Sequence, residues 1–208
     1  MNATGLRRPL TAAFLELAAG RRGHFRLESG HHGGLWLDLD ALFADSLRIE
    51  PFVAALTDAL RAYDVVAVCG PLLGGAFLAQ LVAQALPAEF CFTEREPAAA
   101  SEELYRARYR LPSAFAARIR GKRVAIVDDV MSAGSALRGT YAALRAHGAV
   151  PVVAGAVLVL GSTGSGFFAR EGIPVESVTR DGYDLWPPAD CPLCAAGVPL
   201  QDPAGPAV

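Results

Sequence analysis

Two adjacent carboxylates, Asp128 and Asp129, follow the apolar run 123–127 and precede the small-residue turn 132–135. The turn leads into a helical pattern, so the acidic pair lies at the carboxyl end of a predicted strand, where open parallel sheets bind ligands. Adjacent carboxylates there are costly unless they bind hydroxyls, a metal or cationic groups. Small residues let backbone N–H groups approach an anion, and a helix N-terminus adds partial positive charge. The segment therefore predicts a site for a phosphorylated sugar, with ribose hydroxyls on the carboxylates and the 5′-phosphate in the turn.

The segment differs from two common phosphate-binding motifs. It has neither the Gly-x4-Gly-Lys-Ser/Thr pattern of a Walker loop nor a GxGxxG dinucleotide turn. The alternative interpretation is an acidic turn that only caps the following helix through Ser132 or Ser135.

The elements that must position this site alternate between β-rich runs and helical periodicity, which predicts an α/β fold with helices on both faces of a parallel sheet. Most of the runs are continuously apolar, as strands buried on both faces are. We expect strands at 65–69, 89–93, 123–127, 152–160 and 175–179. We expect helices at 10–19, over the stripe that follows Pro51 as a first-turn residue, and at 74–86, 135–147 and 167–171.

Three regions lie outside this alternation. Residues 23–45 contain Gly-Gly and His-His turns between short β-like pieces, which predicts a small hood. Residues 94–118 show no clean period, which is typical of a functional loop. The tail after Pro187 is rich in Pro and Gly, and we expect it to be extended. We therefore expect one domain over residues 1–208, with a hood at about 10–45, a core at about 46–180 and a tail at about 181–208.

Composition argues against several classes of partner. The chain has 208 residues, of which 52% are hydrophobic and 19% charged, and a formal net charge of −2, so we expect no nucleic-acid or acidic-membrane partner. The longest apolar run, 150–160, is too short to span a bilayer. The N-terminus shows no apolar h-region of a secretory signal, so the expected location is the cytoplasm.

The cysteines and histidines have only weak signals for a metal. Cys191 and Cys194 form a Cys-x-x-Cys pair, but no second Cys-x-x-Cys or Cys-x-x-His completes a tetrahedral zinc site in the sequence. We prefer a turn or small C-terminal knuckle over a zinc ion shared between two subunits, and we expect no metal held by protein side chains. For His31 and His32 we prefer an exposed turn over a base-contacting or proton-relaying pair.

The acidic pair and its turn resemble the binding motif for 5-phosphoribosyl 1-pyrophosphate (PRPP) of type I phosphoribosyltransferases: an apolar strand, Asp-Asp, two residues, then Ser/Thr-x-Gly-Ser/Thr. Other segments resemble the orotate phosphoribosyltransferase branch of that family. These are the hood sequence Phe25–Gly30 with Trp36–Asp38, the pyrophosphate loop Gly70–Gly75, the strand around Phe92, and Cys191–Cys194 with Gly197–Leu200.

The resemblance implies a Rossmann-like core with a hood, and a Mg²⁺-dependent transfer that joins a nitrogenous base to PRPP and releases pyrophosphate, in pyrimidine nucleotide biosynthesis for orotate. It implies that Asp128 and Asp129 hold the ribose hydroxyls. The other implied PRPP contacts are Val130, Met131, Ser132, Ala133, Gly134, Ser135 and Ala136, and, at pyrophosphate and Mg²⁺, Gly70, Pro71, Leu72, Leu73 and Gly74. The candidates for base contact are Ser132, Trp36 and Leu37. A homodimer is implied because the lid of this family reaches into the neighbouring subunit.

Three segments depart from the orotate pattern. Glu28 stands where the hood of those enzymes has lysine, the lid segment 94–110 has no lysine, and Gly161–Gly166 stands where an arginine for the orotate carboxylate is expected. We interpret the glycine run as a flexible connection, with a second anion nest as the alternative.

Arginine is expected to replace lysine at the lid, because guanidinium binds phosphate in a bidentate manner. The residues concerned are Arg95, Arg106, Arg108 and Arg110, of which Arg108 and Arg110 are the catalytic candidates. Alternation places 106, 108 and 110 on one side of an extended segment. The alternative is a solvated basic edge.

Two classes of function follow. The preferred one is an active phosphoribosyltransferase, with orotate ahead of other bases. The alternative is a non-catalytic sensor of PRPP or a nucleotide that keeps the residues 128–136 but has lost the lid chemistry. A sensor that represses transcription also needs a DNA-binding module, and the sequence shows no basic recognition helix.

Overall fold

The computed structural model describes residues 4–27, 31–39, 42–96 and 108–202, with side chains of the first helix from Leu10 onward. The helices are α1 (Thr4–Leu17), α2 (Ser46–Leu60), α3 (Gly74–Ala85), α4 (Ser113–Ile119), α5 (Ser135–Ala146), α6 (Thr163–Arg170) and α7 (Pro192–Ala195), with 3-10 turns at Arg61–Tyr63 and Pro188–Asp190. The strands are β1 (Arg21–Arg26), β2 (His32–Trp36), β3 (Ala67–Pro71), β4 (Glu89–Arg95), β5 (Tyr109–Arg110), β6 (Arg123–Met131), β7 (Val150–Leu160), β8 (Val175–Asp181) and β9 (Leu185–Trp186).

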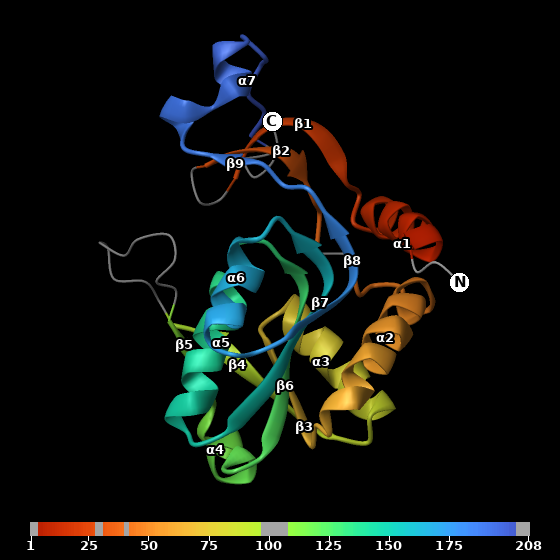
Figure 1. The fold of residues 1–208 in the computed structure, drawn as a ribbon, viewed down its shortest axis with the longest axis vertical. Helices are drawn as coiled ribbons and strands as arrows, with labels where there is room; N and C mark the ends of the chain where they lie inside the picture. The colour runs from red at the N-terminus through yellow and green to blue at the C-terminus, as the bar shows by residue number, and fades with distance from the viewer. Residues whose placement is uncertain (1–3, 28–30, 40–41, 97–107, 203–208) are drawn as a thin grey trace.

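The main sheet has six strands in the order β5-β4-β3-β6-β7-β8. Every pairing from β4 to β8 is parallel, and only the short edge strand β5 runs antiparallel to β4. Helices α2 and α3 lie on one side of this sheet and α4, α5 and α6 on the other (Figure 1). The predicted α/β class, with helices on both faces, is confirmed.

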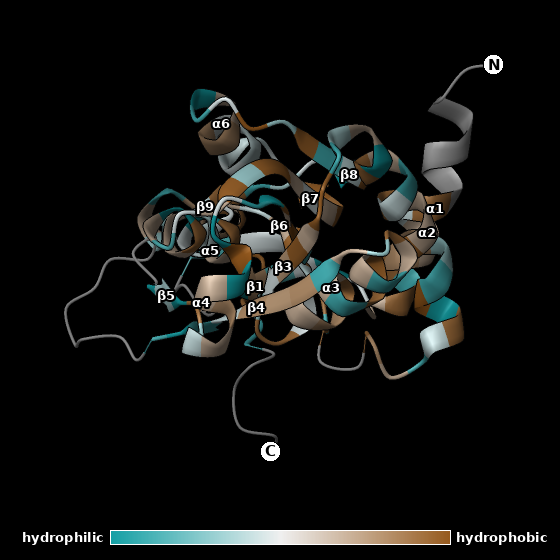
Figure 2. Ribbon diagram, turned by 90° about the horizontal axis from the view of Figure 1, so that it is seen from below, coloured by the Kyte–Doolittle hydropathy of each residue, from teal (hydrophilic) through white to brown (hydrophobic). Residues whose placement is uncertain are grey.

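The core is divided by the sheet, because successive strand residues point to opposite faces. In β6, Ala125 and Val127 pack with the cluster under α2 and α3, while Val124 and Ile126 pack with the cluster under α5 and α6. Both faces are therefore apolar, which explains the uninterrupted apolar runs in the sequence. Figure 2 shows the apolar strands in the middle of the molecule, with hydrophilic residues on the outer sides of the surrounding helices.

A second, three-stranded sheet lies beyond the carboxyl ends of β7 and β8 (Figure 1). Its order is β1-β2-β9, so the strand pair from the segment expected as a hood is extended by a strand from the C-terminal tail. We call this three-stranded sheet the hood sheet. An ion pair between Arg22 of β1 and Asp181 at the end of β8, at 2.6 Å, joins it to the main sheet.

Helix α2 begins earlier than its sequence predicted. We expected Pro51 in the first turn, but the helix starts at Ser46, where the Asp45 side chain accepts hydrogen bonds from the N–H groups of Leu47 and Arg48. Pro51 is inside the helix and leaves the carbonyl of Leu47 without its helical partner. Leu47 is highly exposed, so water can satisfy that carbonyl.

Several other boundaries also differ from expectation. The predicted first helix, 10–19, is shifted to Thr4–Leu17. The segment 94–118 is not uniformly irregular, because its described part contains β5 and α4. The tail is not extended after Pro187 but forms a 3-10 turn and then the single-turn helix α7. Among the described helices, none is both long and apolar enough to cross a membrane.

Candidate functional site

The acidic pair lies inside strand β6, near its carboxyl end, rather than after the strand, because β6 continues to Met131. Asp129 is 7% exposed, and its Oδ1 accepts a hydrogen bond of 2.6 Å from the N–H of Val130. The N–H of Asp129 donates to Asp128 Oδ1 at 3.1 Å. Within the described part of the chain, neither carboxylate forms an ion pair with Lys, Arg or His. A buried carboxyl group, Asp129, and a half-buried one, Asp128, thus lie side by side without an ion-paired cation among the described residues.

The glycine loop that follows β3 packs directly against the pair. A Cβ atom at Gly74 would lie 2.0 Å from Asp129 Oδ2, and one at Gly75 would lie 2.7 Å from Asp128 Oδ1. A Cβ at Gly70 would meet the Gly75 carbonyl oxygen at 1.9 Å. Only glycine permits this approach of the loop backbone to the carboxylates.

The two residues at the tip of this loop extend toward solvent. Leu72 and Leu73 are exposed, the peptide between them is cis, and the Leu72 N–H donates to the Thr93 carbonyl at 2.9 Å. The segment 70–74 therefore offers backbone groups beside the acidic pair, and its leucine side chains do not cover them.

Burial determines the electrostatics of the pair. Burial, and then the charge of Asp129, raises the pKa of Asp128 well above its ordinary value. Burial also raises the pKa of Asp129 to about 6, against the opposing effect of the N–H that its carboxylate accepts from Val130. The adjacent N-terminus of α3, which begins at Gly74, favours the anions. A ligand that donates hydroxyls or brings a cation would stabilise the charged form.

The turn after β6 has the geometry of an anion cradle. Gly134 has φ +74°, in the left-handed region, and serves as the N-cap of α5 without any side-chain cap. The alternative that Ser132 or Ser135 merely caps the helix is therefore wrong. The first N–H groups of α5, from Ser135 and Ala136, are left for a ligand.

Not every predicted member of this segment can reach a ligand through its side chain. Met131 is 1% exposed and packs beneath the turn, and Val130 remains in the strand. Ser132 and Ala133 are half-buried within the turn itself. Contact by Val130 and Met131 is thus limited to their backbone.

The first turn of α6 packs against the turn 132–135. The Gly164 N–H donates to the Ser132 carbonyl at 3.1 Å, and a Cβ at Gly164 would lie 2.8 Å from both the Met131 side chain and that carbonyl oxygen. Most of the run Gly161–Gly166 is therefore helical, because α6 already begins at Thr163. The run is neither the flexible connection that we expected nor mainly an anion nest. Its small residues allow close packing on the turn.

The described arginines of the segment 94–110 point to opposite faces of the sheet at its β4–β5 edge. In the β4–β5 ladder, Arg95 lies opposite Tyr109, and Glu94 lies opposite Arg110. Burial, and then the charge of Asp128, raises the pKa of Tyr109, while Arg95 opposes this shift. Tyr109 and Arg95 are therefore on the side of the acidic pair.

Arg110 points to the other side, because neighbouring strand residues alternate, and it forms an ion pair with Glu94. Arg108 is exposed and continues the ladder through its carbonyl, which accepts from the Glu96 N–H at 2.9 Å. Arg106 lies outside the described residues. The expected common side for alternate arginines therefore faces away from Asp128 of the same chain.

The hood candidates occupy different environments. Trp36 is half-buried, with its ring centroid 6.5 Å from that of Phe25. Leu37 packs against the main core beside Gly20, which indicates a structural role rather than base contact. Glu28 lies outside the described residues.

Two residues near the pair were not predicted from sequence. Tyr109 could have been found from the sequence, because it lies between Arg108 and Arg110 and alternation therefore places it on the opposite side of the strand. Phe43, whose ring lies 3.6 Å from the position of a Cβ on Gly74, had none, because it is brought there from before α2.

Comparison with known proteins agrees with this geometry. Residues 50–178 match the family described as "Phosphoribosyl transferase domain". The chain is 32% identical over 181 residues to an orotate phosphoribosyltransferase of Thermotoga maritima, covering 87% of this chain and 89% of the relative. It is 34% identical over 192 residues to the same enzyme of Carboxydothermus hydrogenoformans, covering 91% and 93%. The crystal structure of orotate phosphoribosyltransferase from Aeropyrum pernix shares the fold with a TM-score of 0.66 and 23% identity, covering 82% of this chain and 93% of that one.

Proposed function

The chain belongs to the phosphoribosyltransferase family, and we propose that it joins orotate to PRPP with release of pyrophosphate, a step of pyrimidine nucleotide biosynthesis. One observation carries the proposal: the pair Asp128 and Asp129 lies between the glycine loop 70–75 and the uncapped N-terminus of α5. This arrangement offers acceptors for two ribose hydroxyls between two backbone surfaces that suit phosphate groups.

The residues of the site have separable roles in this proposal. Asp128 and Asp129 accept from the ribose hydroxyls, which relieves the cost of holding two unpaired carboxylates in a buried site. The backbone N–H groups of 132–136 hold the 5′-phosphate at the α5 N-terminus. With both ends of the sugar fixed, its anomeric carbon is oriented toward the base, which supplies much of the rate by positioning alone.

During transfer the bond from the anomeric carbon to pyrophosphate breaks, with the electron pair leaving on pyrophosphate. A base nitrogen forms the new bond, and the proton of that nitrogen passes to the departing pyrophosphate or to water. Positive charge grows on the ribose and negative charge on the leaving group. The carboxylates stabilise the positive charge on the ribose. The backbone of 70–74 and a cationic side chain stabilise the negative charge on pyrophosphate. Arg95, on the side of Asp128, is the proposed cation from the same chain.

The oxygen donors of the site fit Mg²⁺, which the family uses and which prefers carboxylate, carbonyl and phosphate oxygens. When bound, the ion neutralises charge on the pyrophosphate. The Mg²⁺ ion would be held by the backbone of 70–74 and by the carboxylates of Asp128 and Asp129 together with the ribose hydroxyls. The absence of an ion-paired side chain among the described neighbours of the two carboxylates leaves this position to a ligand cation.

Orotate is proposed as the base because the two curated relatives above carry that activity in their names and align over about nine-tenths of this chain. Ser132 and Trp36 remain the proposed base contacts. We propose that residues 1–208 act as one domain and that the chain forms a homodimer in which Arg108 and Arg110 serve the neighbouring site, since they face away from Asp128 of their own chain.

A pyrophosphate-release assay tests the function. The full-length protein is incubated with PRPP and Mg²⁺ and, in separate reactions, orotate, uracil, hypoxanthine, guanine or adenine. We expect release with orotate at least about tenfold faster than with any other base, because both relatives named above are orotate phosphoribosyltransferases.

Two outcomes would overturn parts of the proposal. Turnover with a purine alone would replace orotate as the base. Saturable PRPP binding by calorimetry, without turnover on any base, would replace the enzyme with a PRPP sensor. The Asp128→Asn, Asp129→Asn double variant is the control for both measurements, because it is expected to lose PRPP binding as well as turnover.

A further inference from the structure

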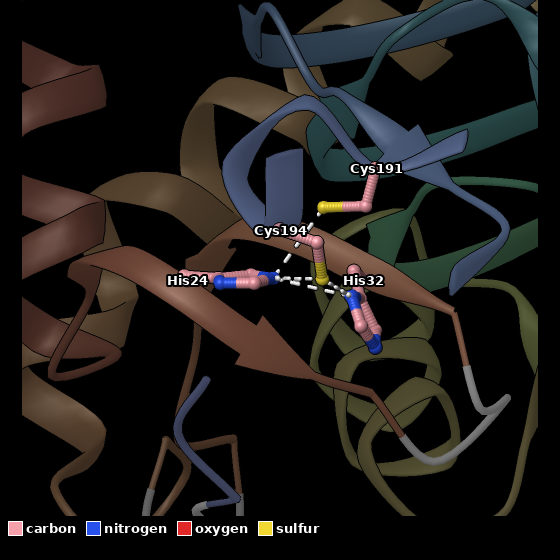
Figure 3. Close-up of side chains that lie close together, drawn as sticks. All are labelled: His24, His32, Cys191 and Cys194. Atoms are coloured by element: carbon pink, nitrogen blue, oxygen red, sulfur yellow. Dashed lines mark hydrogen bonds between the residues drawn. The ribbon is translucent and has the colours of Figure 1, made fainter. Parts of the chain in front are cut away.

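Four potential metal ligands converge between the hood sheet and the C-terminal tail (Figure 3). They are His24 of β1, His32 of β2, Cys191 just before α7 and Cys194 within it. Their ligand atoms all lie within 4.8 Å of one another. The prediction of an exposed turn is wrong for His32, which is 5% exposed and lies in β2. The groups beside Cys191 and Cys194 are two histidines of the hood sheet, which are distant from the pair in the sequence.

Four of the six separations between these atoms are close to the edges of a zinc tetrahedron, and the other two are no longer than 4.8 Å. His24 Nε2 lies 3.1 Å from His32 Nδ1, 3.4 Å from Cys191 Sγ and 3.7 Å from Cys194 Sγ, and Cys194 Sγ lies 3.3 Å from His32 Nδ1. Bonds of about 2.3 Å to sulfur and 2.0–2.1 Å to nitrogen give tetrahedral edges of roughly 3.3 to 3.8 Å. The four separations therefore lie within a few tenths of an ångström of those that a bound zinc ion requires.

The imidazole of His24 is already oriented as a ligand. Its Nδ1 lies 2.8 Å from the carbonyl oxygen of Val198. Because a carbonyl can only accept, Nδ1 carries the proton, and the lone pair of the neutral ring is on Nε2, which faces the other three ligands. A backbone carbonyl behind a metal-binding histidine is the usual second partner that fixes its tautomer.

The backbone brings the ligands together before any ion binds. His32 lies opposite Trp186 in the β2–β9 ladder, and the Gln201 N–H donates to the His24 carbonyl at 2.8 Å. The register of β1 on β2 shifts between Arg22 and Phe25, so His24 lies in a bulge, and bulges re-aim side chains. The single turn of α7 then places both cysteine sulfurs on one side.

We propose that His24, His32, Cys191 and Cys194 bind one structural zinc ion that fastens the C-terminal tail to the hood sheet. Four protein ligands leave no open position for a substrate, so the ion has no part in transfer chemistry. Two thiolates and two imidazoles select zinc over Mg²⁺, which prefers oxygen. His24 and Cys191 are buried, and the exposed Cys194 gives the ion a route of entry. The inference does not depend on the proposed function.

The competing arrangements differ in measurable ways. Without a metal, the same contacts are a hydrogen-bonded cluster in which the His32 Nδ1–H donates to His24 Nε2. Under oxidation, Cys191 and Cys194 could instead form a disulfide. Binding of zinc by the two thiols releases two protons and leaves both sulfurs protected from thiol reagents.

Metal content and absorption-edge spectroscopy test the site directly. The untagged full-length chain, purified without chelator, is expected to contain about one zinc per chain, with two sulfur neighbours at about 2.3 Å and two nitrogen neighbours at about 2.0–2.1 Å. Reconstitution with Co²⁺ should give the absorption of a tetrahedral thiolate site. A chain with no zinc after incubation with the ion, or with oxygen-only neighbours, would overturn the proposal, as would a Cys191–Cys194 disulfide in protein purified anaerobically.

Variants separate a metal site from a merely packed cluster. Cys191→Ser with Cys194→Ser is expected to lower bound zinc at least about tenfold, because neutral hydroxyls do not replace thiolates. His31→Gln, at the neighbouring histidine outside the ligand set, is the matched control and should retain the ion. Should the double variant fail to fold, chelation of the wild type provides the second test. Zinc removal should then lower its melting temperature and zinc addition restore it, and a melting temperature indifferent to both treatments would overturn a structural role.

Discussion

Gly74 and Asp129 touch so closely that a methyl group at position 74 would lie 2.0 Å from Asp129 Oδ2. Gly74 begins helix α3, and Asp129 lies near the carboxyl end of strand β6, 55 positions later in the chain. Their contact couples the loop 70–75 to the carboxylate proposed to accept from the ribose hydroxyls, so a substitution at either position should alter the geometry of both.

Gly74→Ala is expected to lower kcat/KM for PRPP by at least about tenfold, because the methyl group must displace the Asp129 carboxylate. Alanine favours a helix by up to about 1 kcal/mol over glycine, so kcat/KM should fall without a comparable fall in the melting temperature. The control is Gly182→Ala, where a Cβ meets nothing within 4 Å. Steady-state kinetics and thermal melting measure the two effects. Wild-type kinetics for Gly74→Ala would contradict the proposed contact.

Gly134→Ala should weaken binding of PRPP and of ribose 5-phosphate. The left-handed φ of +74° costs alanine about 1–2 kcal/mol, and the new methyl would lie 3.2 Å from Gly164 Cα. Gly172→Ala is the matched control, because it has φ +72° but nothing within 4 Å. Both variants are expected to lose similar stability, and only the first should lose affinity by calorimetry. Equal affinities would place the phosphate elsewhere.

Asp129→Asn should stabilise the ligand-free protein at high pH while slowing transfer by about 10²-fold or more. The folded-state pKa of about 6 lies above the ordinary value, so the folded protein binds more protons and wild-type stability falls as pH rises between about 4 and 6. Asparagine removes this penalty of about 1–3 kcal/mol, so its advantage is full above about pH 6 and small near pH 4.

Denaturant titrations at about pH 4.5 and about pH 8 measure this difference. Asp58→Asn, which removes an exposed carboxylate that pairs with Arg61, is the control for the loss of one negative charge. An advantage for Asp129→Asn that is the same at both pH values would argue against a raised pKa.

Mixing two inactive variants tests whether the lid arginines act across a dimer. Chains with Arg108→Ala and Arg110→Ala have intact carboxylates, and chains with Asp128→Asn and Asp129→Asn have intact arginines. After exchange of subunits, hybrid dimers should contain one complete site and restore up to about a quarter of wild-type activity. Mixtures that stay inactive, despite hybrids verified by mass spectrometry, would place the arginines at the site of their own chain. Arg95→Ala should not be rescued in this way.

Much of the fold and one half of the site could be predicted because their signals are local. Residues 123–135 contain the strand, both carboxylates and the turn in one continuous segment, and the apolar runs indicate strands buried on both faces. The same locality explains the error at Pro51: the capping interaction of Asp45 starts the helix one and a half turns before a residue that is usually found in first turns.

Other parts were decided by tertiary structure. Whether Arg110 faces the acidic pair depends on the register of β5 on β4, and the need for glycine at 74 depends on a carboxylate from another strand. The metal ligands are the clearest case, because the pair Cys191–Cys194 meets His24 and His32 from strands more than 150 residues earlier. The sequence determined which chemical groups are available and their local geometry. Only the folded chain, by closing these long separations, decided which of the groups are neighbours, and the chemistry of a site depends on neighbours within a few ångströms.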